Sequence, residues 1–237
     1  MRNDLAILLV ASLVSYPLGL ALGQPWLLPV LNALPAYIVL VHRLRKGERG
    51  GAVRAMLWWA AALALVGTIA FVWWPAPVGP VVLNGPEYKQ EMFTWIRTGV
   101  GREGSPRLFL PQHLLHLAAF VAIGLVSASA GAILMGALLM NQMSYYVASL
   151  ARAGAPAWAV TLLGWQPWAI ARVAAFATLG VLLAEPLLLR LFPAAREKLR
   201  IGRAAYVMAA MSGILADWFL KALLAPLWGH WLKALLP

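Results

Sequence analysis

The chain has 237 residues, of which 62% are hydrophobic and only 11% charged, with a net charge of +11 and a mean hydropathy of +0.78. Soluble domains are about 45–50% apolar and about 25% charged, so this composition excludes an aqueous globular enzyme, and the lack of cysteine excludes disulfide scaffolds and thiolate metal sites. The basic residues form short clusters between long apolar runs, which is typical of a membrane protein rather than a nucleic-acid-binding one, so we expect the lipid bilayer as partner and no nucleic acid.

Several apolar segments are long enough to cross a bilayer, since a spanning helix needs about 17–25 mostly apolar residues. They are residues 5–22, 26–41, 52–74, 113–128, 132–151, 166–189 and 204–225. The sequence therefore predicts an all-α fold, a polytopic helical bundle of about seven transmembrane helices that makes up a single transmembrane domain over 1–237.

The boundary between the fourth and fifth segments is the least obvious one. Residues 113–151 carry no Asp, Glu, Lys or Arg. At about 1.5 Å per residue, one helix over this stretch would be nearly 60 Å long, about twice the thickness of a bilayer core. We therefore predict a turn at residues 127–131, where small residues follow one another.

The one sizeable segment outside the spans is 75–112, which begins with three closely spaced prolines. From Pro86 onward its pattern predicts a short amphipathic helix with proline in the first turn. We expect the apolar side chains of this helix to lie along the membrane surface or to cap the bundle. These are Met92, Phe93, Trp95 and Ile96.

The distribution of Lys and Arg predicts the orientation of the chain. Residues 43–54 hold five of them and residues 190–203 hold another five, whereas the longer segment 75–112 has only four. By the positive-inside rule both dense clusters are cytoplasmic, and the four spans between them agree with this. We therefore expect an integral protein of a bacterial or archaeal cytoplasmic membrane, with a cytoplasmic N-terminus and an extracytoplasmic C-terminus at Pro237.

Ionisable side chains inside spans are costly and therefore mark candidate functional groups. Asp217 lies near the middle of the last span, and Lys221 follows it by one helical turn, so we expect an i,i+4 ion pair on one face. This pair is either structural or catalytic, through acid–base chemistry at Asp217.

A second set of polar and aromatic residues lies within or beside the fifth and sixth spans. The sequence Gly164–Trp168 contains Pro167, which predicts a break between a short half-helix starting near Ala157 and a full span. Interhelical hydrogen bonds and an aromatic belt are the alternative roles for this set. The candidate substrate-binding residues are Arg172, Asn141, Gln142, Tyr145, Trp165 and Trp168.

Histidines and acids gather on the predicted outer side. His113 and His116 lie one turn apart, His230 lies just beyond the last predicted span, and Glu87 and Glu91 lie in the outer loop. Imidazole and carboxylate are ligands of zinc and copper, so we consider a site for a divalent metal or haem at His113, His116, Glu91 and His230. Interfacial histidines that bind nothing are the alternative.

These residues predict a polar path that opens to the outer side. The first hypothesis is a multi-pass transport or carrier protein, or a permease subunit, for a small, anionic or lipid-like substrate. An intramembrane enzyme acting at the outer leaflet, with or without a metal, is the second. The third is a non-catalytic, cofactor-contacting subunit that docks against additional membrane subunits.

Overall fold

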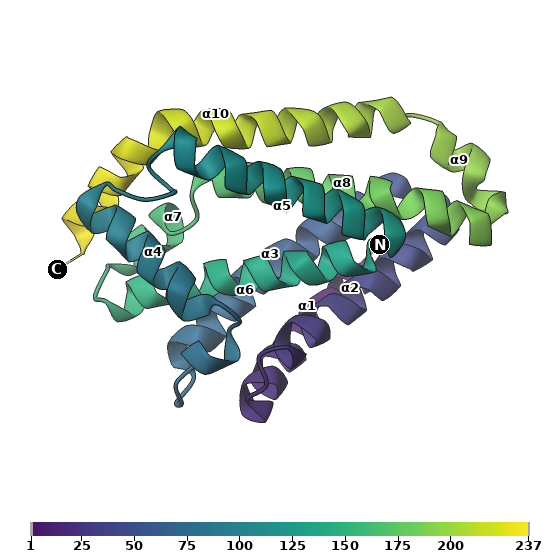
Figure 1. The fold of residues 1–237 in the computed structure, drawn as a ribbon. Helices are drawn as coiled ribbons and strands as arrows, with labels where there is room; N and C mark the ends of the chain where they lie inside the picture. Colours follow the sequence, from purple (N-terminus) through teal and green to yellow (C-terminus); the bar gives the residue numbers. More distant parts are fainter. Residues whose placement is uncertain (1, 237) are drawn as a thin grey trace.

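The computed structural model describes residues 2–236, and this part of the chain is helical without any strand (Figure 1). Its long helices are long and apolar enough to span a membrane, and they confirm the predicted all-α bundle of about seven spans. They are α1 (Arg2–Leu22), α2 (Leu27–Arg45), α3 (Arg49–Trp73), α5 (Pro106–Val126), α6 (Ala130–Arg152), α8 (Pro167–Leu191) and α10 (Arg203–Leu235). The shorter elements are η1 (Gly79–Val81), α4 (Gly85–Thr98), α7 (Ala157–Leu163), η2 (Pro193–Ala195) and α9 (Arg196–Arg200).

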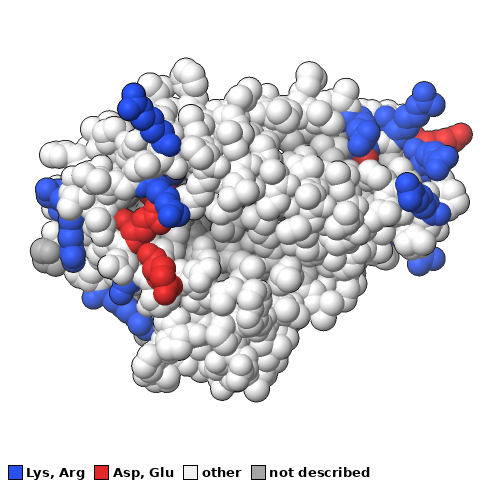
Figure 2. Space-filling model, viewed as in Figure 1, with Lys and Arg blue, Asp and Glu red and all other residues white. Residues whose placement is uncertain are grey.

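The charged side chains lie toward the two ends of the elongated bundle. On the face shown in Figure 2, Lys, Arg, Asp and Glu leave an uncharged band between the ends. Large apolar side chains cover the outside of the spanning helices, among them Leu13, Leu65, Leu115 and Phe219. An apolar band between two charged ends fits the hydrocarbon core of a bilayer between its two headgroup layers.

The spanning helices form two packed groups, and α5 contacts one helix of each group (Figure 1). In one group α1 and α2 form a hairpin against α3, and α3 packs along α6. In the other group α8 packs along α10. Helix α5 contacts both α6 and α8, whereas α6 and α8 barely touch each other. This arrangement leaves space between α6 and α8, with α3 behind it and α5 in front.

The uncharged stretch 113–151 forms two helices, as predicted. Helix α5 ends at Val126 and α6 begins at Ala130, and between them Ala128 and Ser129 adopt positive φ angles of 48° and 67°. The Ser129 hydroxyl donates to the carbonyl of Gly180 in α8 at 2.5 Å. That hydrogen bond fixes the turn to a neighbouring helix.

Some helix ends differ from the prediction. Helix α5 begins at Pro106 rather than at 113, because Pro106 is well suited to a first helical turn. Helix α10 runs to Leu235, ten residues past the predicted end at 225, since Pro226 does not stop it. His230 therefore lies within α10, and the expectation that it lies beyond the last helix is wrong.

The segments α4 and α7 close one end of the bundle, which we call the loop end. Helix α4 buries Met92, Trp95 and Ile96 against α6 and α10, so it caps the bundle as one of the two predicted arrangements requires. The backbone breaks after α7, and Gln166 is extended directly before α8 begins at Pro167. The predicted half-helix before Pro167 is therefore present.

The two basic loops, residues 43–54 and 190–203, lie together at the opposite end, which we call the basic end. The Arg45 guanidinium lies 5.4 Å from the centroid of the Phe192 ring. Arg49 donates to both carboxylate oxygens of Glu185 at 2.5 and 3.0 Å, and it also donates to the carbonyl of Leu199. Both loops therefore face the same side of a membrane. Which side is cytoplasmic stays a prediction, and Pro237 lies outside the described residues.

Candidate amphiphile-binding cavity

A cavity of about 180 Å³ lies between α6 and α8, with α5 in front and α3 behind. Figure 2 shows a hollow on the face that carries α4, α5 and α6, beside a group of acidic side chains. The lining of the cavity runs along α6 from Met143 to Ala132 and along α8 from Ala169 to Val181. These stretches correspond to about 17 and 18 Å of helix, so the cavity follows the spans well into the bundle.

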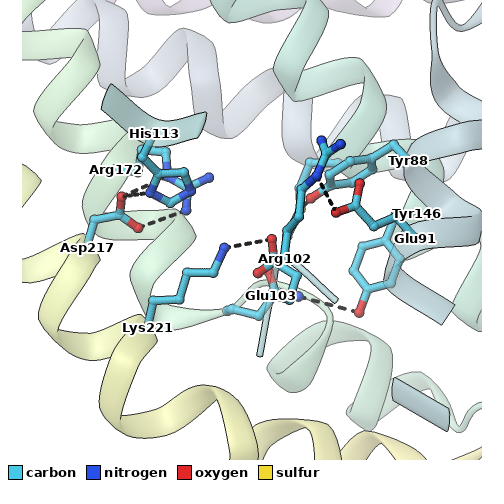
Figure 3. Close-up of polar contacts among 11 residues, drawn as sticks. Tyr88, Glu91, Arg102, Glu103, His113, Tyr146, Arg172, Asp217 and Lys221 are labelled. Carbon is cyan, nitrogen blue, oxygen red and sulfur yellow. Dashed lines mark hydrogen bonds and ion pairs between the residues drawn. The ribbon is translucent and has the colours of Figure 1, made fainter. Parts of the chain in front are cut away.

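The polar residues of the cavity lie toward the loop end. They come from five helices and a loop, and Figure 3 shows several of them pointing toward one another. The polar lining residues are Tyr88, Glu103, Gln112, His113, His116, Gln142, Arg172 and Asp217.

The strongest contact in this group joins α8 to α10. Arg172 donates through Nε and Nη2 to the two carboxylate oxygens of Asp217, both at 2.9 Å. A bidentate guanidinium–carboxylate pair combines charge with fixed geometry. His113 adds its Nδ1 at 3.4 Å from Asp217 Oδ2, although it does not reach hydrogen-bond geometry. Asp217 is therefore held between a cation and an imidazole.

Lys221 binds a residue of the loop before α5. Its Nζ lies 2.8 Å from Glu103 Oε1 and 4.7 Å from the centroid of the Phe109 ring. Asp217 and Lys221 share one face of α10, but each pairs with a partner on another element. The expected Asp217–Lys221 ion pair is therefore wrong, because spacing along a helix does not reveal which charges a neighbouring segment offers.

Two groups at the cavity lie outside the spanning helices, and their environment fixes their ionisation. Burial opposes ionisation of Glu103, but the nearby charges of Lys221 and Arg172 outweigh it and hold the pKa of this carboxyl below its ordinary value. Burial raises the pKa of the Tyr88 hydroxyl, which donates to the sulfur of Met143 at 3.4 Å. Glu103 is thus anionic and Tyr88 neutral at physiological pH.

The other end of the cavity is apolar. Aromatic side chains of α3, α5 and α8 line it, and the rings of Phe120 and Phe176 stack with their centroids 4.7 Å apart. At Gly136 and Gly180 the absence of a side chain leaves room beside Trp59 and Phe120. One continuous cavity thus joins a charged end to an apolar end. No family model, curated protein or solved structure matches this chain.

Three of the candidate substrate-binding residues line this cavity and three do not. Arg172, Gln142 and Trp165 are part of the lining. Asn141 instead accepts hydrogen bonds from Tyr16 at 2.8 Å and from Asn32 at 3.0 Å, which is the interhelical role weighed for it. Asn141 is therefore corrected to a structural position, because it points from α6 toward α1 and α2.

The two remaining aromatic candidates pack elsewhere at the loop end. Trp168 is buried edge-on between Trp95 and Trp228, at centroid distances of 6.5 and 5.9 Å. Tyr145 packs edge-on against Phe71 at 6.2 Å and faces a second groove. Neither residue lines the cavity, so a substrate-binding role for Trp168 and Tyr145 stays a prediction.

The proposed metal ligands are not gathered around one point. His113 and His116 both line the cavity, so these two of the proposed ligands lie beside one space. Glu91 pairs with Arg102 at 3.5 Å, and His230 is exposed. No group of three or more His, Asp or Glu able to hold a metal ion forms within residues 2–236. The expected four-residue metal or haem site is therefore not assembled.

Sequence reasoning missed two parts of the polar architecture. Glu103 lies in the loop at residues 99–105. The only sequence feature that could have marked it as a candidate functional residue is that acidic residues are rare in this chain. Arg49 was counted only for topology, yet it is 4% exposed and bound to Glu185, which is 2% exposed. Arg203 Nε also lies 3.3 Å from Glu185 Oε2, and Arg49 donates to the carbonyl of Ile201, directly after α9. This second group of contacts therefore fastens α9 to the spanning helices.

Proposed function

We propose that the chain is an integral membrane carrier for an amphiphile with an anionic headgroup. The observation that carries this proposal is the single cavity whose charged end continues into an apolar end between α6 and α8. A ligand with one polar and one apolar part satisfies both ends at once, whereas a small hydrophilic solute leaves the apolar end unfilled.

Within the Arg172–Asp217 pair the cation, rather than the acid, faces the open space, and this favours an anion. The Arg172 side chain is 26% exposed and that of Asp217 is 3% exposed. Nε and Nη2 of Arg172 both donate to Asp217, and among the described residues Nη1 has no hydrogen-bond acceptor. A guanidinium held in this way presents preorganised N–H donors to a phosphate or carboxylate. His116, half-buried in the same lining, adds a further donor.

The position of the opening favours entry from the bilayer. The hollow in Figure 2 lies on a face that also displays the apolar surface of the spanning helices. The cavity lining includes five residues of α5 and seven of α6, so it follows the seam between these helices. A lipid-like ligand entering there keeps its tail in an apolar environment throughout. The predicted topology puts the charged end in the outer half of the membrane.

Binding of two probes that differ only in headgroup tests this proposal. In detergent micelles we expect a fluorescent lysophosphatidic acid to bind more tightly than a monoacylglycerol with the same labelled chain. Arg172→Lys keeps the charge but removes the bidentate geometry, so we expect it to weaken lysophosphatidic acid binding roughly 10-fold to 100-fold. Monoacylglycerol binding should change little.

The apolar end is tested with a matched pair of variants. Gly136→Leu places a leucine side chain in the cavity, while Ala122→Leu places the same side chain on the exposed side of α5. We expect Gly136→Leu to abolish binding of both probes and Ala122→Leu to leave both unchanged. Equal binding by all variants, or equal affinity for both headgroups, would overturn the proposal. Transfer of the probe between leaflets of proteoliposomes then distinguishes a carrier from a binding subunit.

A second candidate function is an intramembrane enzyme that uses acid–base chemistry. It is favoured by the contact of His113 with Asp217, since a carboxylate beside an imidazole orients the ring for proton transfer. Both groups line the cavity. Mass spectrometry of the probe after incubation separates the two functions, because a carrier returns the probe intact and an enzyme returns a product whose formation stops in His113→Gln.

A further inference from the structure

A second concave surface lies at the loop end, between α4 and the end of α6, and it shares no lining residue with the cavity. We call it the basic groove; its volume is about 690 Å³. Residues of one face of α4 and the last two turns of α6 line it. Its basic members are Lys89 and Arg97 of α4 and Arg152, the last residue of α6.

The charge of the basic groove is uncompensated. No acidic side chain lines it, and among the described residues none lies within 4.0 Å of a charged nitrogen of Lys89, Arg97 or Arg152. By contrast, Arg172 in the cavity and Lys221 one turn beyond Asp217 are both paired with carboxylates. Three like charges facing one space repel one another unless an anion lies between them. The groove is therefore more stable when it holds an anion.

Neutral hydrogen-bonding groups of the groove suit a phosphate. The Thr94 hydroxyl and the Gln90 side-chain amide line the groove, whereas the Ser149 hydroxyl already donates to the carbonyl of Tyr145 at 2.7 Å and has no proton left for a ligand. Arg97 lies 5.8 Å from the Phe93 centroid, which holds its guanidinium close to α4. Phosphate oxygens accept hydrogen bonds from both guanidinium and hydroxyl donors.

The position of the groove relative to the ends of the spanning helices indicates which kind of phosphate-bearing molecule it binds. Arg152 donates to the carbonyl of Val72 at 3.3 Å, and Val72 lies in the last turn of α3. The groove is thus level with the ends of two spanning helices, next to Trp73, which is 80% exposed. Aromatic side chains at helix ends mark the headgroup layer of a bilayer. We propose that the basic groove binds the phosphate group of an anionic membrane lipid.

Native mass spectrometry of the purified protein with added phosphatidylglycerol or phosphatidylcholine tests this site. We expect selective binding of phosphatidylglycerol. In the triple variant Lys89→Gln/Arg97→Gln/Arg152→Gln its affinity should fall about 100-fold, since each interfacial charge contributes about fivefold. The charge-conserving variant Lys89→Arg/Arg97→Lys/Arg152→Lys should retain binding.

A matched control removes the same charge from the basic end. Arg190, Arg196 and Arg200 are exposed, and their triple Gln variant should bind phosphatidylglycerol like the unaltered protein. An equal loss in that control, or no loss in the groove variant, would overturn the site. Inorganic phosphate distinguishes the source. If it raises the melting temperature through these three residues while the two lipids bind equally, the lipid assignment is wrong. The outcome is independent of the proposed carrier function, because Arg172 and Gly136 are unchanged in these variants.

Discussion

The Arg172 guanidinium meets the Asp217 carboxylate edge to edge, with both N···O distances at 2.9 Å, and thereby ties the second turn of α8 to the middle of α10. The Asp217 side chain is only 3% exposed. Removing one partner of such a pair leaves a buried charge without compensation, which costs about 3–5 kcal/mol. The pair is therefore a structural tie as well as the charged end of the cavity.

We expect Arg172→Gln to lower the stability of the protein by about 3–5 kcal/mol and Arg172→Gln/Asp217→Asn to recover much of that loss. The measurement is the free energy of unfolding in one detergent. Arg102→Gln is the matched control, because the Arg102–Glu91 pair is more exposed and contributes at most about 1 kcal/mol. A double variant no more stable than the single one would contradict this coupling.

The Lys221–Glu103 contact should persist through weakly acidic pH. Glu103 has a lowered pKa in the folded protein, so its contribution to stability is present above the ordinary Glu value of about 4.3 and is lost only as pH falls through the lower folded value. The protection factors of residues 99–105 in hydrogen exchange, which correct for the slower intrinsic exchange in acid, should therefore be retained at pH 5 and fall in more acidic solution. In Glu103→Gln the exchange should already be fast at pH 7. Loss of protection above pH 5 in the unaltered protein would contradict a lowered pKa of Glu103.

At the basic end, Arg49→Met should release α9 from the bundle. Arg49 binds Glu185 and the carbonyls of Leu199 and Ile201, so its loss leaves a buried carboxylate and two unbound carbonyls. We expect rapid tryptic cleavage within residues 196–200 and a loss of about 3–5 kcal/mol. Arg54→Met, at an exposed position of α3, should do neither. Equal cleavage rates for both variants would exclude a fastening role for Arg49.

Single-cysteine labelling tests the orientation, since the chain has no native cysteine. Lys46→Cys and Arg196→Cys, both exposed at the basic end, should react with an impermeant maleimide only after the cell is opened. Thr98→Cys at the loop end should react in intact cells. Labelling of Lys46→Cys and Arg196→Cys from outside would invert the topology and place the cavity's charged end in the inner half of the membrane.

The sequence was sufficient for the helical architecture and for part of the site. Hydropathy reveals spanning helices because each must bury its backbone within about 20 apolar residues, and the uncharged length of 113–151 predicted the turn before Ala130. Arg172 and His113 were found because ionisable groups in spans are rare. Pairings were not predictable: Lys221 binds Glu103, 118 residues away, and nothing in local spacing records which loop folds over α10.

The turn at Ala128 and Ser129 has a consequence for the range of ligands. It holds α5 and α6 together at the basic end, where Gly124, Ala132 and Leu183 pack so closely that a side chain at Gly124 would lie 2.9 Å from Leu183. Of these residues Ala132 lines the cavity. Under the proposed function we expect this packing to form the floor of the apolar end, so that the distance from Arg172 to the floor limits the length of the ligand's tail. Probes of increasing chain length should gain affinity up to one length and then lose it, whereas affinity that keeps rising would show that the floor yields.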